Sequence, residues 1–342
     1  MPLQDRVLVL RDFMLETSLD DISDELRSRG YHVERGPQIF PSAEGERNVT
    51  DLSPYLHDID VVLSTNRTKL SKELLASAKR LKGIVYPAIG TESVDLEAAN
   101  DCTIIVAHGP TPENFNALAE ASVMLILSLM YDLNGTQRIL RENLARPTEM
   151  RARMLKGKMV GIVGFGRIGR GVAERLQNWD VDVVVYSRHL DSNKLPAHVR
   201  GVPLDELLSV SDVVSLHATL TNENRHLLNE RRLRLMKRTA YLVNTARGGL
   251  IDEAALVRVL RNEEIAGAAL DTFEHEPLDK EHPLRTLPNV MLTPHMVGLT
   301  REIFDAIPVA AIENVTRILR GVAPLYCKNP ELLPLWQQRV GA

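Results

Sequence analysis

Short, continuous apolar runs alternate with stretches of helical periodicity along most of this 342-residue chain. The runs that we read as strands form two series, the first being Val7–Leu10, Val61–Leu63, Gly83–Val85 and Thr103–Val106, and the second Met159–Val163, Val181–Tyr186, Val213–Leu216, Ala240–Val243, Gly267–Leu270 and Val290–Leu292. Strands that are apolar at every position are buried on both faces, which is typical of a parallel sheet covered by helices. The alternation therefore predicts an α/β fold with two doubly wound, Rossmann-like parallel sheets.

The two series of strands predict two domains. A long helical stretch begins after Pro112 and joins the first series to the second. After Thr300 the chain is helical and contains no new strand series, so we expect it to return to the first domain. We therefore expect a discontinuous domain, residues 1–107 plus 300–342, and a second domain from 108 to 299.

The charge balance bears on possible partners. The chain carries 41 basic and 45 acidic residues, a net charge of −4. A domain that binds nucleic acid is normally basic. The densest basic run, Arg231 to Arg238, is read as a solvated helix face. The composition therefore predicts no nucleic-acid partner.

Cysteine content and hydropathy indicate a cytoplasmic protein. Cys102 and Cys327 form no Cys-x-x-Cys motif and no disulfide framework, which suits a reducing compartment. Asp5 and Arg6 lie where a signal peptide needs an apolar run. The most apolar stretch, Phe115 to Tyr131, is interrupted by polar residues, so we expect a buried helix and no membrane partner.

A glycine motif follows the first strand of the second series. Gly164, Gly166 and Gly169 form G-x-G-x-x-G between a strand and the predicted helix Arg170–Asn178, which is the context that a dinucleotide site requires. The first glycine permits the tight turn, the second admits a pyrophosphate, and the third lets helix and strand pack closely. The helix N-terminus offers N–H groups to the phosphates. The predicted cofactor contacts in this loop are Gly164, Gly166, Arg167, Ile168 and Gly169.

The end of the next strand bears on the choice of cofactor. An acidic residue there would accept hydrogen bonds from the adenosine ribose and repel a 2′-phosphate. Ser187 and Arg188 occupy this position, and a neutral hydroxyl beside a cation suits a 2′-phosphate. The sequence therefore favours NADP, with NAD as the alternative if Arg188 is simply exposed.

Three further segments follow strands of the second series and carry polar side chains. Arg247 follows the strand Ala240–Val243, Glu276 lies shortly after Gly267–Leu270, and His295 follows the last strand. The carboxyl ends of parallel strands meet at one edge of a sheet, where ligands bind. We therefore expect a cation, a carboxylate and an imidazole at the same edge as the glycine loop.

From Leu155 to Thr300 the sequence resembles the D-isomer-specific 2-hydroxyacid dehydrogenase family, through the glycine loop and the three segments above. The stretch Ala88-Ile89-Gly90 resembles the substrate loop of that family. The resemblance implies two similar α/β domains around a cleft, with the substrate domain made from both ends of the chain. It also implies homodimers that form through the cofactor domain.

The resemblance assigns a role to each matching residue. The residues and their implied roles are Arg247 for binding the substrate, Glu276 as the carboxylate beside the acid–base, His295 as the acid–base, Asp271 as the aspartate near the nicotinamide, and Ile89 and Gly90 as N–H donors to the substrate carboxylate. A guanidinium grips a carboxylate or keto oxygen with a rigid donor fork. An imidazole can protonate a keto oxygen as hydride reaches C2, and an adjacent carboxylate favours its charged form. The implied activity is hydride transfer between a nicotinamide dinucleotide and C2 of a small 2-keto or D-2-hydroxy acid, with no metal ion.

The sequence departs from the family pattern near the substrate positions. His108 stands where Asn is usual, Thr219 where Pro is usual, and Val297 where a small residue is usual. Thr91-Glu92-Ser93 beside the substrate loop is also unusual. These departures leave the identity of the 2-keto acid open.

Three other functions remain as alternatives. A formate dehydrogenase-like enzyme is expected to carry Gln in place of Glu276. A dinucleotide-sensing protein, like the corepressors of this fold, can retain all three catalytic positions. A metal hydrolase is disfavoured because Asp279 lies where the motif H-E-x-x-H needs its second histidine.

Overall fold

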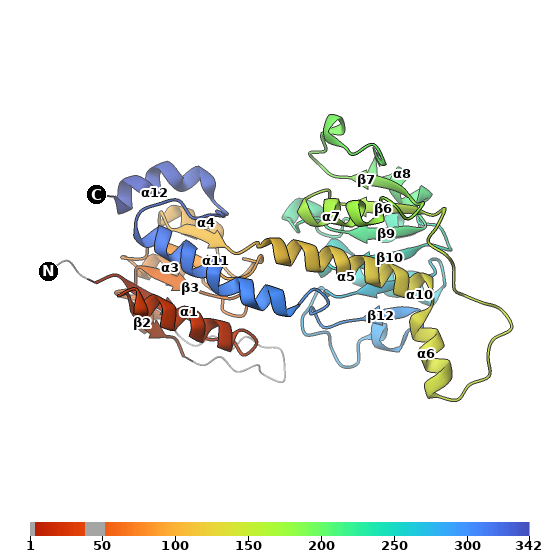
Figure 1. Ribbon diagram of the computed structural model, residues 1–342, viewed down its shortest axis with the longest axis horizontal. Coiled ribbons are helices and arrows are strands. Elements are labelled where there is room, and N and C mark those ends of the chain that lie inside the picture. The colour runs from red at the N-terminus through yellow and green to blue at the C-terminus, as the bar shows by residue number, and fades with distance from the viewer. Residues whose placement is uncertain (1–3, 38–51, 342) are drawn as a thin grey trace. The chain divides into compact units, whose positions relative to one another are not determined.

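The computed structural model describes residues 4–37 and 52–341, so the first three residues of the amino-terminal segment considered for a signal peptide lie outside it. The chain divides into two compact units, residues 1–113 with 300–342, and residues 114–299. Each unit contains one parallel sheet, with five strands in the first and seven in the second (Figure 1). The predicted α/β class with two parallel sheets is confirmed.

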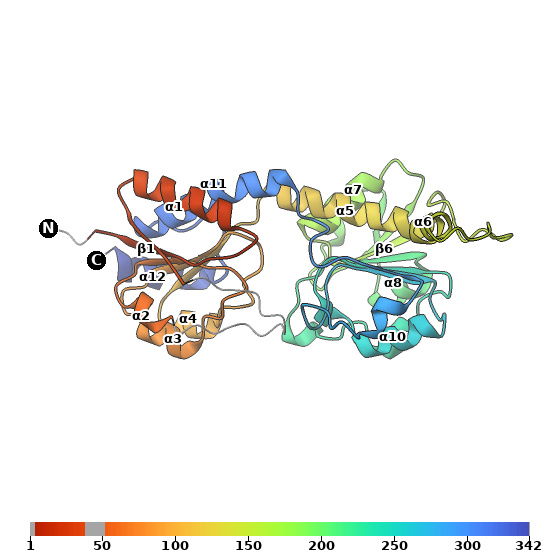
Figure 2. The same cartoon turned by 90° about the horizontal axis from the view of Figure 1, so that it is seen from below.

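The first unit has the strand order β2-β1-β3-β4-β5. Its strands are β1 (Arg6–Val9), β2 (His32–Arg35), β3 (Val61–Leu63), β4 (Gly83–Tyr86) and β5 (Ile105–His108). Its helices are α1 (Glu16–Ser28), α2 (Ser53–Leu56), α3 (Lys72–Ser77), α4 (Leu96–Asp101), α11 (Arg301–Leu319) and α12 (Leu333–Val340). Helices α1 and α11 pack together on one face of the sheet, and α2, α3 and α4 cover the other (Figure 2).

The second unit has the strand order β12-β11-β10-β9-β6-β7-β8. Its strands are β6 (Met159–Val163), β7 (Asp182–Tyr186), β8 (Val199–Gly201), β9 (Val213–Leu216), β10 (Tyr241–Asn244), β11 (Gly267–Leu270) and β12 (Val290–Leu292). Its helices are α5 (Pro112–Met130), of which the first two residues belong to the first unit, α6 (Leu133–Arg141), α7 (Arg167–Leu176), α8 (Leu204–Val210), α9 (Glu230–Leu233) and α10 (Glu253–Arg261). The strand order reverses between β6 and β9, and this switch point is where α/β sheets bind ligands.

Two apolar cores explain why the strands of the second sheet are apolar throughout. Successive side chains of a strand point to opposite faces of the sheet. Val183 and Val185 pack into one core with α5 and α7, whereas Val184 packs into the other with α8 and α10. Tyr241 and Leu242 divide in the same way between the two cores. Both faces are therefore buried, as the continuous apolar runs indicated.

Sequence reading missed two strands and placed one helix start too late. His32–Arg35 and Val199–Gly201 are edge strands that carry charged residues, so neither forms an apolar run. Helix α7 begins at Arg167, three residues before its predicted start, because Gly166 is its N-cap. The loop residues 167–169 therefore form the first turn of the helix.

Helix α5 is the apolar stretch that we read as a buried helix. Nine of its 19 residues are buried in the fold. Within residues 4–37 and 52–341, no single helix has the length and apolar character needed to cross a membrane. Among the helices that the structure describes, only α5 and α6 taken together pass that test of length and composition, and they are bent by 61° relative to each other.

Candidate functional site

The predicted polar residues of the second unit meet at the carboxyl edge of its sheet. Strands β10, β11 and β12 are neighbours, and the segments that carry Arg247, Glu276 and His295 follow them in that order. The glycine loop follows β6, which is separated from β10 only by β9. The parallel arrangement thus brings four segments together that span more than 130 positions of the chain.

His295 and Glu276 form a hydrogen-bonded pair at this edge. The imidazole Nδ1 lies 2.7 Å from the Glu276 Oε2 atom. The two side chains are 46% and 36% exposed, so the pair is open to a ligand. Burial raises the pKa of Glu276, but the hydrogen bond and charge of His295, the Phe273 N–H and the Arg247 charge outweigh it and leave that pKa below its usual value. The carboxylate is therefore ionised at neutral pH.

Asp271 fastens the turn that carries His295. Its buried Oδ1 atom accepts hydrogen bonds from the Thr293 hydroxyl at 2.6 Å and from the amides of Met296 and Val297 at 2.9 and 3.1 Å. Burial raises the pKa of Asp271 above its usual value, although these hydrogen bonds and His295 act in the opposite direction. His295 lies inside this turn with a φ of 56°, a left-handed conformation that the surrounding hydrogen bonds must hold.

Arg247 is positioned by a side chain that sequence reading did not single out. Asn244 ends β10, accepts a hydrogen bond from the Ala246 amide at 3.0 Å and donates one to the Arg247 carbonyl at 3.0 Å. These are the contacts of an Asx turn, for which an asparagine at a strand end is the available signal. The turn sets the direction in which Arg247 leaves the sheet.

Gly248 allows the Arg247 segment to lie directly against the Glu276 segment. A Cβ atom at this position would lie 1.9 Å from the Phe273 carbonyl carbon. The close approach places the Arg247 charge near enough to Glu276 to stabilise its carboxylate. The glycine that follows Arg247 is therefore part of the site geometry.

The glycine loop has the geometry that a pyrophosphate needs. Gly164 has a φ of 96°, and a Cβ there would lie 2.5 Å from the Ala218 amide nitrogen. A Cβ at Gly169 would lie 2.2 Å from the Gly164 carbonyl oxygen. A Cβ at Gly166, by contrast, would meet nothing within 4 Å, and no side chain caps the start of α7. The loop therefore leaves space and N–H groups at the helix N-terminus for a dinucleotide.

Ser187 and Arg188 follow β7 at the same edge. Arg188 is 53% exposed, and its Nη1 atom lies 3.9 Å from the Glu223 Oε2 atom. An exposed pair at this distance is weak, so the guanidinium can turn toward a phosphate at little cost.

His217 follows β9 next to the glycine loop and was not among the predicted site residues. Its amide donates to the Val163 carbonyl at 2.7 Å, and its Nε2 lies 2.8 Å from the Ser215 hydroxyl. Burial lowers the pKa of His217 to about 4, so this imidazole is neutral at physiological pH. A histidine at a strand end was the only sequence signal for it.

Ile89 and Gly90 follow β4 and belong to the first unit. The His108 Nδ1 atom lies 3.0 Å from the Ile89 carbonyl oxygen. Because a carbonyl only accepts hydrogen bonds, Nδ1 carries the proton in this contact. His108, at the end of the neighbouring strand β5, thus holds the predicted substrate loop.

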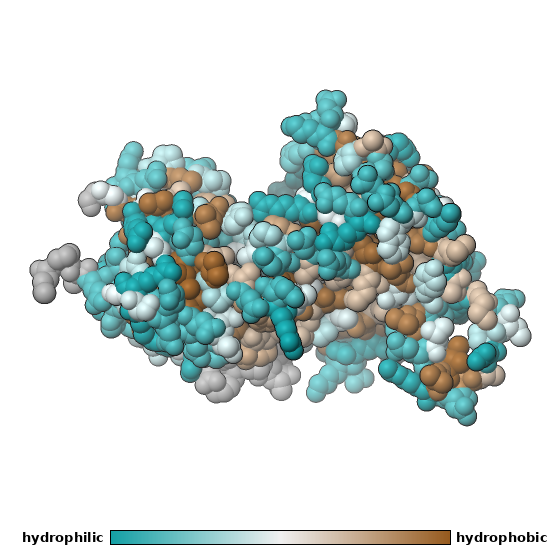
Figure 3. Space-filling view, viewed as in Figure 1, coloured by the Kyte–Doolittle hydropathy of each residue, from teal (hydrophilic) through white to brown (hydrophobic). Residues whose placement is uncertain are grey.

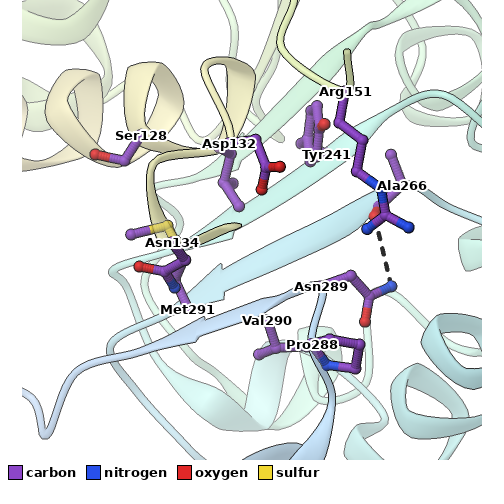
Figure 4. A pocket seen from close by; sticks show the side chains of 11 residues that line it. Ser128, Asp132, Asn134, Arg151, Tyr241, Ala266, Pro288, Asn289, Val290 and Met291 are labelled. Atoms are coloured by element: carbon purple, nitrogen blue, oxygen red, sulfur yellow. Dashed lines mark hydrogen bonds between the residues drawn. The ribbon is translucent and has the colours of Figure 1, made fainter. Parts of the chain in front are cut away.

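A small pocket of about 50 Å³ lies away from these residues, at the amino ends of β10, β11 and β12 (Figure 4). Tyr241, Ala266 and Val290 contribute to its lining. It is at the opposite edge of the sheet from Arg247 and His295, so we do not assign the ligand site to it. In the part of the chain that the structure describes, no group of three or more metal-binding side chains is arranged to hold an ion.

Comparison with known proteins identifies the family. Residues 123–297 match the NAD binding domain of D-isomer specific 2-hydroxyacid dehydrogenases. A glyoxylate reductase from Thermofilum pendens is 39% identical over 284 residues, which cover 81% of this chain and 84% of the relative. The solved structure of a glyoxylate reductase from Paecilomyes thermophila has 27% identity and a TM-score of 0.84, with 97% of this chain and 99% of that chain covered. An NAD-dependent formate dehydrogenase from Staphylococcus aureus in complex with NAD has 30% identity and a TM-score of 0.78, with 91% and 95% covered. The chain belongs to the D-isomer specific 2-hydroxyacid dehydrogenase family and is an NAD(P)-dependent oxidoreductase.

Proposed function

We propose that this enzyme reduces a small 2-keto acid to its D-2-hydroxy acid, with His295 as the acid–base and Arg247 as the substrate-binding cation. The observation that carries the proposal is the 2.7 Å contact between His295 and Glu276 at the sheet edge where Arg247 and the glycine loop also lie. When bound, the nicotinamide supplies the hydride to C2 or accepts it from C2.

Each proposed residue has one task in the reaction. The amides of Ile89 and Gly90 hold the substrate carboxylate, and the Arg247 fork binds its carboxylate or keto oxygen. Glu276 accepts a hydrogen bond from the Nδ1–H group of His295, so the Nε2–H group remains to protonate the keto oxygen. In the reverse direction the neutral Nε2 atom takes the hydroxyl proton.

The proposed substrate is glyoxylate or a similar small 2-keto acid, because relatives named glyoxylate reductase align with most of the chain. The proposed cofactor is NADPH, with NADH as the alternative. Ser187 offers no carboxylate to repel a 2′-phosphate, and Arg188 is exposed beside it. The glycine loop contacts proposed for either cofactor are those of Gly164, Gly166, Arg167, Ile168 and Gly169, with Asp271 near the nicotinamide.

A homodimer is also proposed, formed through the cofactor-binding unit. Helix α6 has no buried residue, and apolar side chains on it and on the segment that follows are exposed, with Leu140 84%, Met150 73% and Met154 66% accessible. Figure 3 shows apolar side chains at the surface in the region of α6. Such a patch marks an interaction surface.

The proposed location is the cytoplasm, in keeping with two free cysteines.

Formate oxidation is the second candidate, favoured by similarity to a solved formate dehydrogenase. Glu276 argues against it, because a glutamine is expected at this position in that activity. A dinucleotide-sensing protein of the same fold would bind the cofactor without turnover.

A kinetic screen tests the proposal. Purified enzyme is mixed with glyoxylate and other small 2-keto acids, with NADH and with NADPH, and with formate and either oxidised cofactor. We expect turnover of a 2-keto acid, higher kcat/KM with NADPH, and a loss of roughly 10²- to 10⁴-fold in His295→Ala. Turnover of formate alone would support the second candidate, and cofactor binding without any turnover would support the sensing protein.

A further inference from the structure

The pocket at the amino edge of the second sheet is not used by the proposed reaction. It is lined by the end of α5, the start of α6, Arg151 and the amino ends of β10, β11 and β12 (Figure 4). Its volume is about 50 Å³. A buried water molecule needs roughly 10–15 Å³ of such space, so the pocket has room for a ligand of about four or five non-hydrogen atoms.

A buried tyrosine hydroxyl in this pocket has no hydrogen-bond partner. Tyr241, the first residue of β10, lines the pocket and is only 9% exposed. In the part of the chain that the structure describes, its hydroxyl makes no hydrogen bond. Leaving a buried polar group without a partner costs free energy, so a ligand that supplies the partner is favoured.

Two side chains of opposite charge line the pocket near Tyr241. Burial raises the pKa of Tyr241 above its usual value, and Arg153 acts in the opposite direction. Asp132 also raises that pKa and Arg151 also lowers it, so both pocket charges are close enough to act on the hydroxyl. Among the described residues, neither the Asp132 nor the Arg151 side chain has an ion-pair or hydrogen-bond partner. Figure 4 shows Tyr241 between these two side chains.

The Asp132 carboxylate is not used to cap its own helix. Asp132 is the N-cap of α6 and has a φ of 47°, but its side chain makes no capping hydrogen bond. Aspartate at this position usually accepts one from the first turn of the helix. Gly135 gives the carboxylate room, because a Cβ there would lie 2.4 Å from the Asp132 Oδ2 atom. The carboxylate is therefore free to pair with an ammonium group.

We infer that this pocket binds a small zwitterionic amino acid of the size of glycine. The Arg151 guanidinium and the Tyr241 hydroxyl bind the carboxylate of the ligand, and Asp132 binds its ammonium group. A simple anion would be repelled by Asp132 and a simple cation by Arg151, so the two charges together select a zwitterion. The inference goes beyond the proposed function, because it uses no residue at the carboxyl edge of the sheet.

Calorimetric titration of the full chain with glycine tests the inference, without cofactor or keto acid in the sample. We expect one site per chain with a dissociation constant of roughly 0.01–1 mM, because so few ligand atoms limit the affinity. Acetate lacks the ammonium group and methylamine lacks the carboxylate. Each should bind at least about tenfold more weakly than glycine, because one charge-assisted hydrogen bond is lost.

Three variants each remove one partner of the ligand. Tyr241→Phe, Asp132→Asn and Arg151→Met should each weaken glycine binding at least about tenfold. Asp132→Asn should also remove the preference for glycine over acetate, and Arg151→Met the preference over methylamine. Tyr241→Phe keeps the aromatic ring that packs in the core, so it removes the hydroxyl without changing the packing.

Arg247→Met is the matched control, because it removes an arginine at the opposite edge of the same sheet. It should bind glycine with the wild-type affinity. Lost binding in Arg247→Met together with unchanged binding in Arg151→Met would place glycine at the proposed active site and overturn the inference. Absence of saturable binding up to about 10 mM glycine, equal affinity for acetate, or wild-type affinity in Tyr241→Phe and Asp132→Asn would also overturn it. None of these results bears on the reduction of a 2-keto acid, which the kinetic screen tests separately.

Discussion

His295 combines an exposed imidazole with a backbone conformation that few side chains adopt. Its φ of 56° lies in the left-handed region, which histidine tolerates better than branched residues do. Asp271 holds the turn from below, and Glu276 holds the ring at Nδ1. Asp271 therefore holds the backbone around His295, and Glu276 holds the His295 side chain.

Replacing Glu276 by Gln should change the pH dependence of the reaction. The pKa of Glu276 is below its usual value, so the carboxylate is charged at neutral pH and favours the protonated imidazole. The Glu276→Gln variant lacks the charge that favours the protonated form of the neighbouring imidazole. The alkaline fall in kcat/KM for reduction should therefore move to lower pH, and the rising limb for oxidation should move with it.

The pH profiles are measured with saturating cofactor. Maximal activity should fall less in Glu276→Gln than in His295→Ala, because the amide variant still has a proton donor. Glu274→Gln is the control. The Glu274 carboxylate lies in the same loop as Glu276, but its Oε1 atom lies 2.5 Å from the Nε2 atom of His226 and not beside His295. An alkaline limb that stays in place in Glu276→Gln would mean that another group tunes the histidine, and Asp271 would be tested next.

At the scale of elements, Gly248 and Gly166 lie at the same sheet edge but have different surroundings. Gly248 lets the segment after β10 touch the segment after β11, where a Cβ would lie 1.9 Å from a backbone carbon. A Cβ at Gly166, in contrast, would meet nothing within 4 Å at the start of α7. The first glycine serves the packing of loops, and the second keeps room for a ligand.

Alanine at these two positions should therefore have separable effects. Gly166→Ala should keep the wild-type Tm and weaken NADPH binding at least about tenfold, because the methyl group occupies the space of the pyrophosphate. Gly248→Ala should lower the free energy of unfolding by about 1–3 kcal/mol and reduce turnover, because the two loops must separate. Thermal unfolding measures the stability of each variant, and fluorescence titration with NADPH measures its affinity for the cofactor. A lower Tm in Gly166→Ala together with wild-type cofactor binding would refute the assignment.

At the scale of the whole molecule, the exposed apolar side chains on and after α6 are the basis of the proposed homodimer. Burying such side chains against a second copy is favourable in proportion to the apolar area removed from water. Helix α6 has no buried residue, so tertiary packing within the chain does not bury its apolar side chains.

Leu140→Glu should weaken the proposed homodimer. Leu140 is 84% exposed, and a carboxylate in its place would be desolvated in an interface at a cost that raises the dimer dissociation constant at least about tenfold. Light scattering across a concentration series measures the change. Val309→Glu is the control, because Val309 is 72% exposed on α11 and outside the proposed surface. A monomeric wild type at every concentration would exclude the homodimer.

The sequence alone determined the strands that are buried on both faces, because each one is a continuous apolar run. It also placed Arg247, Glu276 and His295 after strands, and parallel strands bring such positions to a common edge. The edge strands β2 and β8 escaped prediction, since charged residues interrupt their apolar character. The start of α7 was placed late because a glycine N-cap carries no side-chain signal.

Only the tertiary structure decided which side chains touch. The contact between Glu276 and His295 and the bonds from Asp271 to the turn around His295 join residues that are 19 to 26 positions apart. Strand order and loop conformation set such distances, and neither is encoded in local residue patterns. Burial also sets the direction of a pKa shift, as for Asp271, and burial is a property of the packed chain. The residue types therefore follow from the sequence, whereas the contacts between them follow from the fold.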